Sequence, residues 1–191
     1  MNEGGQAGKQ VGKYRIIRAL GQGGEGSVYL AEDESLGRQV AVKRLWGREE
    51  PEEASFLRDL RHPMLPVVYE LLHEDGWYLV MEYIEGISLH NYIEKQGRVE
   101  EGQARLWAAA LLDVLDYLHT RETPVIYRDL KPDNIMVCRE GSLKLVDFGA
   151  AALRCFGEAG VGRMAYSDGF AAPEQRGEDG LGVRADERSD L

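Results

Sequence analysis

The segment Tyr127-Arg128-Asp129-Leu130-Lys131-Pro132-Asp133-Asn134 is the most informative stretch of this chain. It places an acid (Asp129), a cation (Lys131) and an amide that can bind a metal (Asn134) within six residues. Further on, Asp147-Phe148-Gly149 follows a hydrophobic strand-like run. Phosphoryl transfer needs a carboxylate to position or deprotonate the acceptor, oxygen ligands for Mg²⁺ and a cation that offsets developing charge. The two segments therefore predict a phosphoryl-transfer site.

A glycine-rich loop, Gly21-Gln22-Gly23-Gly24-Glu25-Gly26, lies upstream between two predicted strands. Glycines there let main-chain amides approach phosphate oxygens closely. The pattern is weak alone, because many hairpins contain glycine and dinucleotide-binding folds use similar spacing. Dinucleotide-binding folds, however, need a helix directly after the loop. Here Ser27-Val28-Tyr29-Leu30 has the pattern of a strand, which disfavours the dinucleotide-binding interpretation.

Two charged residues between these segments, Lys43 and Glu53, do not indicate a function by themselves. Lys43 ends the apolar run Val40-Ala41-Val42, and its simplest interpretation is an edge lysine whose ammonium group reaches water. Glu53 belongs to the acidic cluster 49–53, which is also typical of a solvated helix start stabilised by the helix dipole.

Strand-like patterns dominate up to residue 83, and helical patterns dominate after residue 86. The predicted strands are Tyr14–Leu20, Ser27–Glu32, Gln39–Leu45, Pro66–His73 and Trp77–Tyr83, with one helix over Glu50–Leu60. The clearest later element is a helix over Glu101–His119, whose apolar residues recur at three- and four-residue steps. Short strands follow at Asn134–Val137 and Leu143–Val146. The predicted fold class is α+β, with a small β-rich lobe before a larger helical lobe.

Composition limits the function classes. The 191 residues include 33 acidic and 23 basic side chains, and the net charge of −10 argues against a general nucleic-acid binder or a surface for anionic lipid. Cys138 and Cys155 have no metal-site spacing and fit a reducing cytosol. No apolar run approaches the ~18 residues that span a bilayer. We therefore predict a cytoplasmic protein with no membrane segment and with a flexible tail over residues 1–13.

Together these motifs resemble the catalytic domain of eukaryotic-type serine/threonine protein kinases, in a form similar to bacterial members. The resemblance runs from about Tyr14 to Leu191 and implies a two-lobe fold, with the N-lobe over 14–84 and the C-lobe over 85–191. The family domain normally continues for several more helices, so the C-lobe is expected to be incomplete. The implied reaction transfers the γ-phosphoryl group of ATP, with Mg²⁺ or Mn²⁺, to a serine or threonine hydroxyl of a protein substrate.

The resemblance implies a set of nucleotide contacts. The glycine loop would cover the phosphates, Lys43 would hold the α- and β-phosphates, and Glu53 would pair with Lys43. The main chain of Glu82 and Ile84 would bond the adenine edge. The complete implied set of nucleotide-binding residues is Gly21, Gly23, Gly26, Val28, Ala41, Lys43, Met81, Glu82, Ile84 and Met136.

The resemblance also implies catalytic roles. Asp129 would be the catalytic base and Lys131 a contact to the γ-phosphate, while Asn134 and Asp147 would be the magnesium ligands. The presence of lysine at position 131 argues for serine/threonine acceptors. Asp190 would hold the main chain of the catalytic loop. In a chain that ends at residue 191, however, we expect this aspartate to lack fixed partners and the loop to be loose.

The chain departs from the family pattern at two places. Tyr127 replaces the usual histidine, and we expect its ring to pack under Phe148 in the same way. The segment 147–174 contains no threonine, so activity should not require the usual activation-loop phosphate. The alternative is a pseudokinase, or an inactive fragment, that acts as a nucleotide-binding or scaffold module. The histidines, His62, His73, His90 and His119, are assigned structural roles only.

Overall fold

The computed structural model describes residues 7–23, 26–46, 57–153, 170–171 and 187–190. The chain divides into two compact units, Met1–Arg61 with Pro66–Ile84 and His62–Leu65 with Glu85–Leu191. The short segment His62–Leu65 therefore belongs to the second unit, although it lies within the range 14–84 predicted for the first lobe. Most of the helix predicted over Glu50–Leu60, and with it Glu53, lies outside the described residues.

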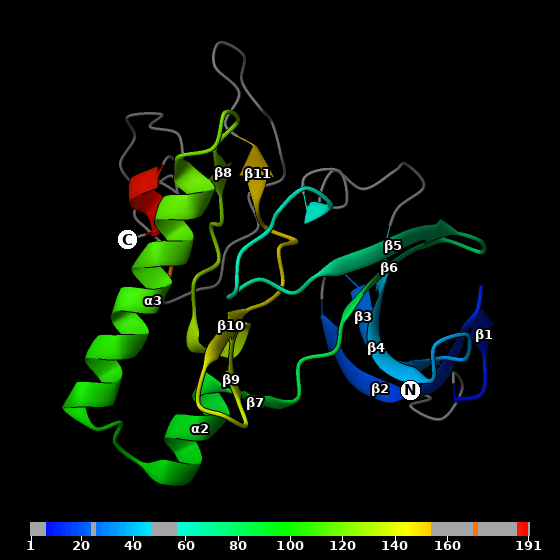
Figure 1. The fold of residues 1–191 in the computed structure, drawn as a ribbon, viewed down its shortest axis with the longest axis horizontal. Coiled ribbons are helices and arrows are strands. Elements are labelled where there is room, and N and C mark those ends of the chain that lie inside the picture. The colour runs from blue at the N-terminus through cyan, green and yellow to red at the C-terminus, as the bar shows by residue number, and fades with distance from the viewer. Residues whose placement is uncertain (1–6, 24–25, 47–56, 154–169, 172–186, 191) are drawn as a thin grey trace. The chain divides into compact units, whose positions relative to one another are not determined.

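The first unit contains a curved, six-stranded antiparallel sheet with the order β1-β2-β3-β4-β6-β5 (Figure 1). Its strands are β1 Gln10–Val11, β2 Tyr14–Gly23, β3 Gly26–Asp33, β4 Arg38–Leu45, β5 Val68–His73 and β6 Trp77–Glu82. All five strands predicted between residues 14 and 83 are present. β5 starts two residues later than predicted, since Pro66 has no N–H to donate to a strand partner.

The two-residue period of a strand predicts that Val40 and Val42 point one way along β4 and that Ala41 and Lys43 point the other, and the structure confirms this alternation. Val40 and Val42 point to one face of the sheet, because successive side chains of a strand alternate between faces. On that face they join the core cluster Val11, Tyr14, Ile16, Ala31, Val40, Val42, Tyr78 and Val80. Ala41 and Lys43 lie on the opposite face and are also buried.

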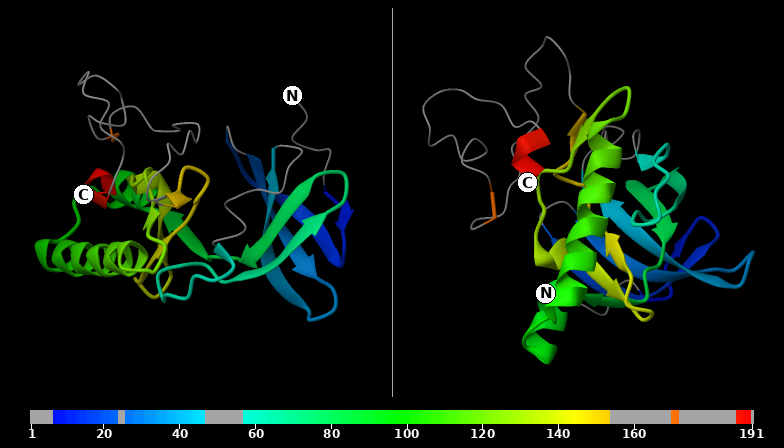
Figure 2. Two further views of the ribbon diagram at one scale, coloured as in Figure 1. Left: turned by 90° about the horizontal axis from the view of Figure 1, so that it is seen from above. Right: turned by 60° about the vertical axis from the view of Figure 1, so that its left-hand side comes forward.

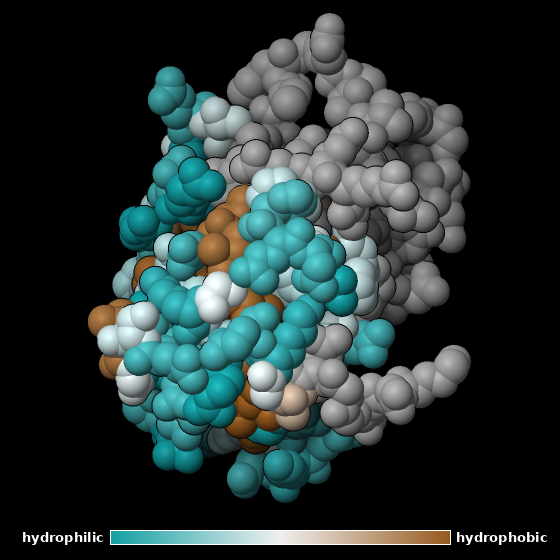
Figure 3. All heavy atoms as spheres, turned by 90° about the vertical axis from the view of Figure 1, so that its right-hand side faces the viewer, coloured by the Kyte–Doolittle hydropathy of each residue, from teal (hydrophilic) through white to brown (hydrophobic). Residues whose placement is uncertain are grey.

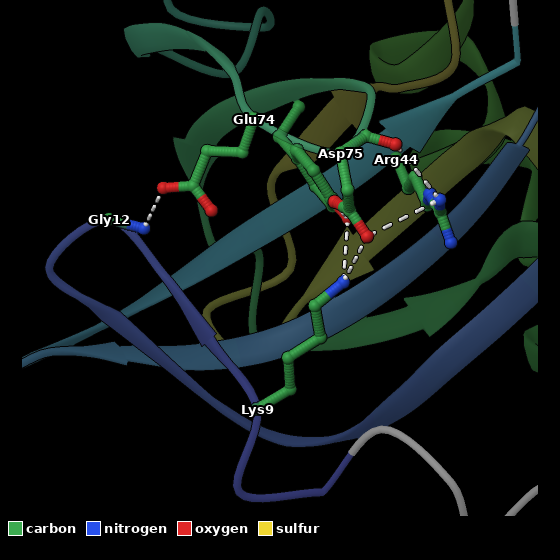
Figure 4. Close-up of polar contacts among 6 residues, drawn as sticks. Lys9, Gly12, Arg44, Glu74 and Asp75 are labelled. Carbon is green, nitrogen blue, oxygen red and sulfur yellow. Dashed lines mark hydrogen bonds and ion pairs between the residues drawn. The ribbon is translucent and has the colours of Figure 1, made fainter.

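The N-terminal segment corrects the predicted flexible tail for residues 7–13. Val11 pairs with Tyr14 as part of strand β1 and is buried in the core. Figure 4 shows two further ties to the β5–β6 turn: the Gly12 N–H donates to Glu74 (2.7 Å), and Lys9 Nζ donates to Asp75 (2.9 Å). The sequence pattern missed this strand because one apolar residue among polar ones carries no periodicity.

The second unit contains two α-helices among its described residues, α2 Leu89–Gln96 and α3 Glu101–His119. The predicted bounds of α3 are confirmed, and its buried residues are Trp107, Val114, Leu115 and Leu118. A three-stranded sheet has the order β10-β9-β7, with β7 Gly86–Ser88, β9 Ile135–Cys138 and β10 Leu143–Leu145. Strand β8 Val125–Ile126 pairs with β11 Ala152–Leu153. Two 3₁₀ turns complete the unit, η1 Pro132–Asn134 and η2 Glu187–Asp190.

Hydrophilic side chains cover most of the described surface on the face that Figure 3 shows, and apolar side chains form small patches between them. Among the described residues, no helix is both long and apolar enough to cross a membrane.

Candidate active site

The loop that contains η1 brings three of the predicted catalytic residues together. Lys131 Nζ donates to Asp129 Oδ2 at 2.6 Å, and Asn134 Nδ2 donates to the same oxygen at 2.8 Å. Asn134 Nδ2 also donates to the main-chain oxygen of Asp129 at 2.9 Å. Pro132 favours the tight turn because its fixed φ suits the first helical position. The sequence order acid, cation, amide thus becomes one hydrogen-bonded cluster.

The second carboxylate oxygen of Asp129 has a different environment. Asp129 Oδ1 is buried and accepts no hydrogen bond from the part of the chain that the structure describes. A buried, charged oxygen without a donor costs free energy, so such a site favours a ligand that brings a hydroxyl or N–H group. Asp129 is therefore held through one oxygen and can accept a proton or a hydrogen bond through the other.

The two predicted metal ligands are linked through the main chain. The Val146 N–H donates to the Asn134 carbonyl at 2.9 Å, which fixes the residue before Asp147 beside the catalytic loop. Asp147 itself is exposed and has a φ of 62°. A carboxylate and an amide oxygen are ligands that suit Mg²⁺, which usually completes its coordination with water and substrate phosphates. The donor set at this site therefore fits the ion.

Tyr127 packs as the sequence predicted. Its ring meets Phe148 edge to face, with the centroids 5.0 Å apart and the planes at 81°. The phenol is fully buried, and its hydroxyl donates to the Val146 carbonyl. Burial raises the pKa of Tyr127 well above its ordinary value, and the nearby charges of Asp147 and Asp129 add to the effect. The hydroxyl is therefore protonated and available as a donor at neutral pH.

Asp190 holds the main chain before Asp129, as the resemblance implied, and the expectation that it lacks fixed partners is wrong. Its carboxylate accepts the N–H of Tyr127 at 2.7 Å and the N–H of Arg128 at 2.6 Å. Arg128 has a φ of 70°, a conformation that costs a non-glycine residue about 1–3 kcal/mol. The two bonds to Asp190 stabilise this strained residue directly before the catalytic aspartate.

His119 is a site residue that the sequence did not reveal. Its Nε2 lies 2.9 Å from Asp190 Oδ2, so the end of α3 orients the carboxylate that holds the catalytic loop. In both views of Figure 2, η2 lies beside α3. The two residues are 71 positions apart, and no local sequence pattern connects them.

In the first unit, strand register places several predicted nucleotide contacts on one face of the sheet. Val28 pairs with Lys43, and Ala41 pairs with Met81, so all four side chains point to the same side. β4 is an interior strand and Lys43 is only 4% exposed, which excludes the edge-lysine interpretation.

In the glycine loop, packing excludes a side chain at one described glycine but not at another. A Cβ at Gly26 would lie 2.0 Å from the Arg44 carbonyl oxygen, so this glycine is required by the approach of β4. A Cβ at Gly21 would have nothing within 4 Å, so packing against the described residues does not require a glycine there. Gly23 pairs with Gly26, and residues 24 and 25 between them lie outside the described ranges.

The remaining predicted adenine contacts lie in two different elements. The Glu82 N–H donates to the Val67 carbonyl at 2.8 Å, so an adenine could not take a hydrogen bond from it. Ile84 follows β6 and is half-buried. Met136 lies on β9 of the second unit, between Ser88 on β7 and Lys144 on β10.

The family of the chain follows from its match to a family model. The family model described as the protein kinase domain matches residues 14–187. The chain belongs to the protein kinase family. The fold class and the serine/threonine-type resemblance predicted from the sequence are thereby confirmed.

The individual relatives that the chain resembles carry the names of serine/threonine-protein kinases. The chain is 36% identical to the serine/threonine-protein kinase PrkC of Bacillus subtilis over 155 residues, which cover 75% of this chain and 24% of that protein. It is 33% identical to a probable serine/threonine-protein kinase, SCO3848, of Streptomyces coelicolor, over 94% of this chain and 28% of the relative. It is also 33% identical to CBL-interacting serine/threonine-protein kinase 8 of Arabidopsis thaliana, over 87% of this chain and 39% of the relative. The chain thus spans about a quarter to two fifths of the length of these relatives.

Proposed function

We propose that this protein transfers the γ-phosphoryl group of ATP to a serine or threonine hydroxyl of a protein substrate. The observation that carries the proposal is the environment of Asp129. One of its oxygens is held by Lys131 and Asn134, while the other is buried with no partner among the described residues. An acceptor hydroxyl would satisfy this second oxygen and would be oriented by it for attack on the phosphorus.

The other residues of the second unit have supporting roles in this proposal. Lys131 Nζ already lies at the carboxylate of Asp129, where it would offset the negative charge of the transferred group. Asn134 and Asp147 would hold Mg²⁺. The bound ion would neutralise charge on the β- and γ-phosphates. Asp190 and His119 would keep the loop rigid enough for the acceptor to stay in line.

The first unit would bind the nucleotide through one face of its sheet. Val28, Ala41 and Met81 offer apolar surface for the adenine. Lys43 would bond the α- and β-phosphates, with Glu53 as its ionic partner. The loop from Gly21 to Gly26 would cover the phosphates with main-chain N–H groups. A cytoplasmic location, where ATP and protein substrates are both present, is part of the same proposal.

Substitution of Asp129 tests the function directly. Asp129→Asn keeps the size of the side chain but removes the proton acceptor, so phosphoryl transfer should fall by about 10²–10⁴-fold while ATP affinity changes little. The matched control is Asp133→Asn, an exposed carboxyl in the same loop, which should keep wild-type turnover. Turnover is measured as phosphate incorporated into a generic protein substrate, and binding is measured by calorimetry. If wild-type protein binds Mg-ATP but transfers no phosphate, the pseudokinase interpretation replaces this proposal.

A further inference from the structure

Residues 9–13 join two parts of the first sheet that lie far apart in its strand order. β1 and β5 are the two edges of this sheet. The Gly12 N–H nevertheless donates to Glu74 Oε1 at 2.7 Å, and Lys9 Nζ donates to Asp75 Oδ2 at 2.9 Å, so the segment reaches the turn between β5 and β6 (Figure 4). The curvature of the sheet brings this turn close to β1 (Figure 1). We call residues 9–13 the clasp.

One buried side chain holds the clasp in place. Val11 packs in the core cluster together with Tyr78 and Val80 of β6. An ion pair between partly exposed groups, such as Lys9 and Asp75, contributes little by itself because water screens it. Burial of Val11 therefore supplies an attachment that does not depend on charge, and the polar contacts fix which groups of the turn the clasp meets.

Asp75 connects the clasp to both β4 and β6. The Tyr78 hydroxyl donates to Asp75 Oδ1 at 2.6 Å and accepts from Lys9 Nζ at 2.9 Å. Arg44 Nη2 donates to the main-chain oxygen of Asp75 at 3.4 Å. Arg44 and Tyr78 are themselves partners in the register of β4 and β6. The clasp is thus bonded to β6 directly and to β4 through Asp75.

Lys43 lies at the end of the sheet that the clasp holds. It precedes Arg44, and the pairing of β4 with β6 ends one position further on, where Leu45 pairs with Trp77. The ends of paired strands open more readily than their centres, because fewer contacts hold them closed. An opening of the two outermost pairs would therefore reach Lys43.

We propose that the clasp is coupled to the nucleotide site: it opens together with the end of the β4–β6 pair that carries Lys43, so that a nucleotide bound to Lys43 holds the clasp closed. The inference rests on the proposed function, because it takes Lys43 as a phosphate contact. It goes beyond the family match, since the family model covers residues 14–187 and the clasp precedes them. Coupling of this kind is reciprocal, so a closed clasp also favours nucleotide binding.

Hydrogen exchange of the full chain, measured by NMR spectroscopy with and without Mg-ADP, tests the coupling. ADP carries the α- and β-phosphates that Lys43 would hold, and it is not consumed. At a concentration about ten times its Kd, Mg-ADP suppresses openings that prevent its binding by up to about tenfold. We expect exchange to slow by about three- to tenfold both at residues 43–45 and at the Gly12 amide. A clasp that only stabilises the fold would show no such change at Gly12.

Substitutions of Lys9 show which contact carries the coupling. Lys9→Met keeps most of the side-chain stem but loses the charge and the donor. Residues 43–45 should then exchange about three- to tenfold faster than in wild type, the range for one lost hydrogen bond. Mg-ADP should also slow the Gly12 amide less in this variant. Lys9→Arg keeps a positive charge and N–H donors, so it should restore most of both effects.

Two controls show that the effect is local and specific. Arg18→Met removes the same charge from an exposed residue of β2, whose guanidinium donates to the neighbouring Ala19 carbonyl. This variant should exchange like wild type at residues 43–45 and at Gly12. Exchange in α3 of the second unit should be the same in all variants, which shows that the compared proteins remain folded.

The results that would overturn the inference differ from those that would overturn the proposed function. Protection of residues 43–45 by Mg-ADP without protection of Gly12 would show that the clasp opens independently of the nucleotide site. Wild-type exchange at residues 43–45 in Lys9→Met would likewise exclude the coupling. Failure of the wild-type protein to bind Mg-ADP at all would instead overturn the proposed function, and the nucleotide coupling with it.

Discussion

Lys43 lies on an interior strand with 4% of its surface exposed, so protein groups rather than water surround its charge. An ammonium group in such a place offers a strong, charge-assisted contact to a phosphate, worth roughly 1.5–3 kcal/mol. We therefore expect Lys43→Ala to lower the affinity for Mg-ATP by about ten- to a hundredfold. Calorimetry checks this, with Lys95→Ala on the exposed side of α2 as the control. Equal ATP affinity in Lys43→Ala and wild type would exclude the lysine from the site.

The Asp75 carboxyl should make the stability of the fold depend on pH. Hydrogen bonds from Tyr78 and from Lys9 lower the pKa of Asp75 from 3.8 to about 2. A lowered carboxyl pKa stabilises the fold above pH 4, and this contribution is lost as the pH falls from about 4 towards 2. Because the side chain is 55% exposed, the contribution should stay below about 1 kcal/mol.

The measurement compares unfolding of wild type and Asp75→Asn across this range. We expect the wild type to be the more stable protein near neutral pH and the difference to shrink between pH 4 and pH 2. A difference that stays constant with pH would show that the ionised carboxylate of Asp75 is not what stabilises the β5–β6 turn.

Helix α3 is connected to the 3₁₀ turn η2 through its last residue, His119. His119 contacts Asp190, and Asp190 in turn holds the main chain of Tyr127 and Arg128. Loss of the imidazole should cost about 0.5–1.5 kcal/mol of stability and should also loosen the loop that carries Asp129. We expect His119→Ala to lower kcat more than it raises KM for ATP, because the loop supplies the acceptor side of the site.

Two further variants, His119→Gln and His90→Ala, show whether the effect on kcat comes from the contact of His119 with Asp190. His119→Gln retains an N–H donor and should recover part of the lost kcat, whereas a purely structural role would give no such recovery. His90→Ala removes an exposed histidine from α2 and should leave both stability and kcat unchanged. If His119→Ala lost stability but kept wild-type kcat, the link from α3 to the catalytic loop would be only structural.

Ligand binding acts on the whole molecule, because a ligand that binds only the folded state shifts the unfolding equilibrium. At a concentration about 100 times its Kd, Mg-ATP should add about 2.7 kcal/mol and raise the Tm by about 5–10 °C. In Asp147→Asn the part of this rise that depends on Mg²⁺ should disappear. Asp116→Asn, an exposed carboxyl on α3, is the control. A full Mg²⁺-dependent shift in Asp147→Asn would remove this residue from the metal site.

Hydrophobic periodicity predicted the longer elements of the chain but not the shortest strand. The apolar run of β4 predicted a strand from Gln39 to Leu45, one residue shorter than the observed Arg38–Leu45. The packing of Val40 and Val42 in the core cluster became visible only in the folded sheet. The three- and four-residue steps of α3 predicted its bounds from Glu101 to His119. β1 was not predicted, because two residues are too short for a period and because Val11 is buried in a cluster that includes distant residues such as Tyr78 and Val80 of β6.

The sequence by itself determined the family, the order of the two units and the residue types of the site, since each of these lies in a few neighbouring residues such as Asp129 to Asn134. Only the tertiary structure decided how that site is held. The contact of His119 with Asp190 spans 71 positions, and the bond from Tyr127 to Val146 spans 19. Asp129 Oδ1 is buried without a hydrogen-bond donor among the described residues, and this too depends on which groups fold around it. Periodicity and motif spacing describe neighbours along the chain, whereas these contacts exist only after folding brings distant segments together.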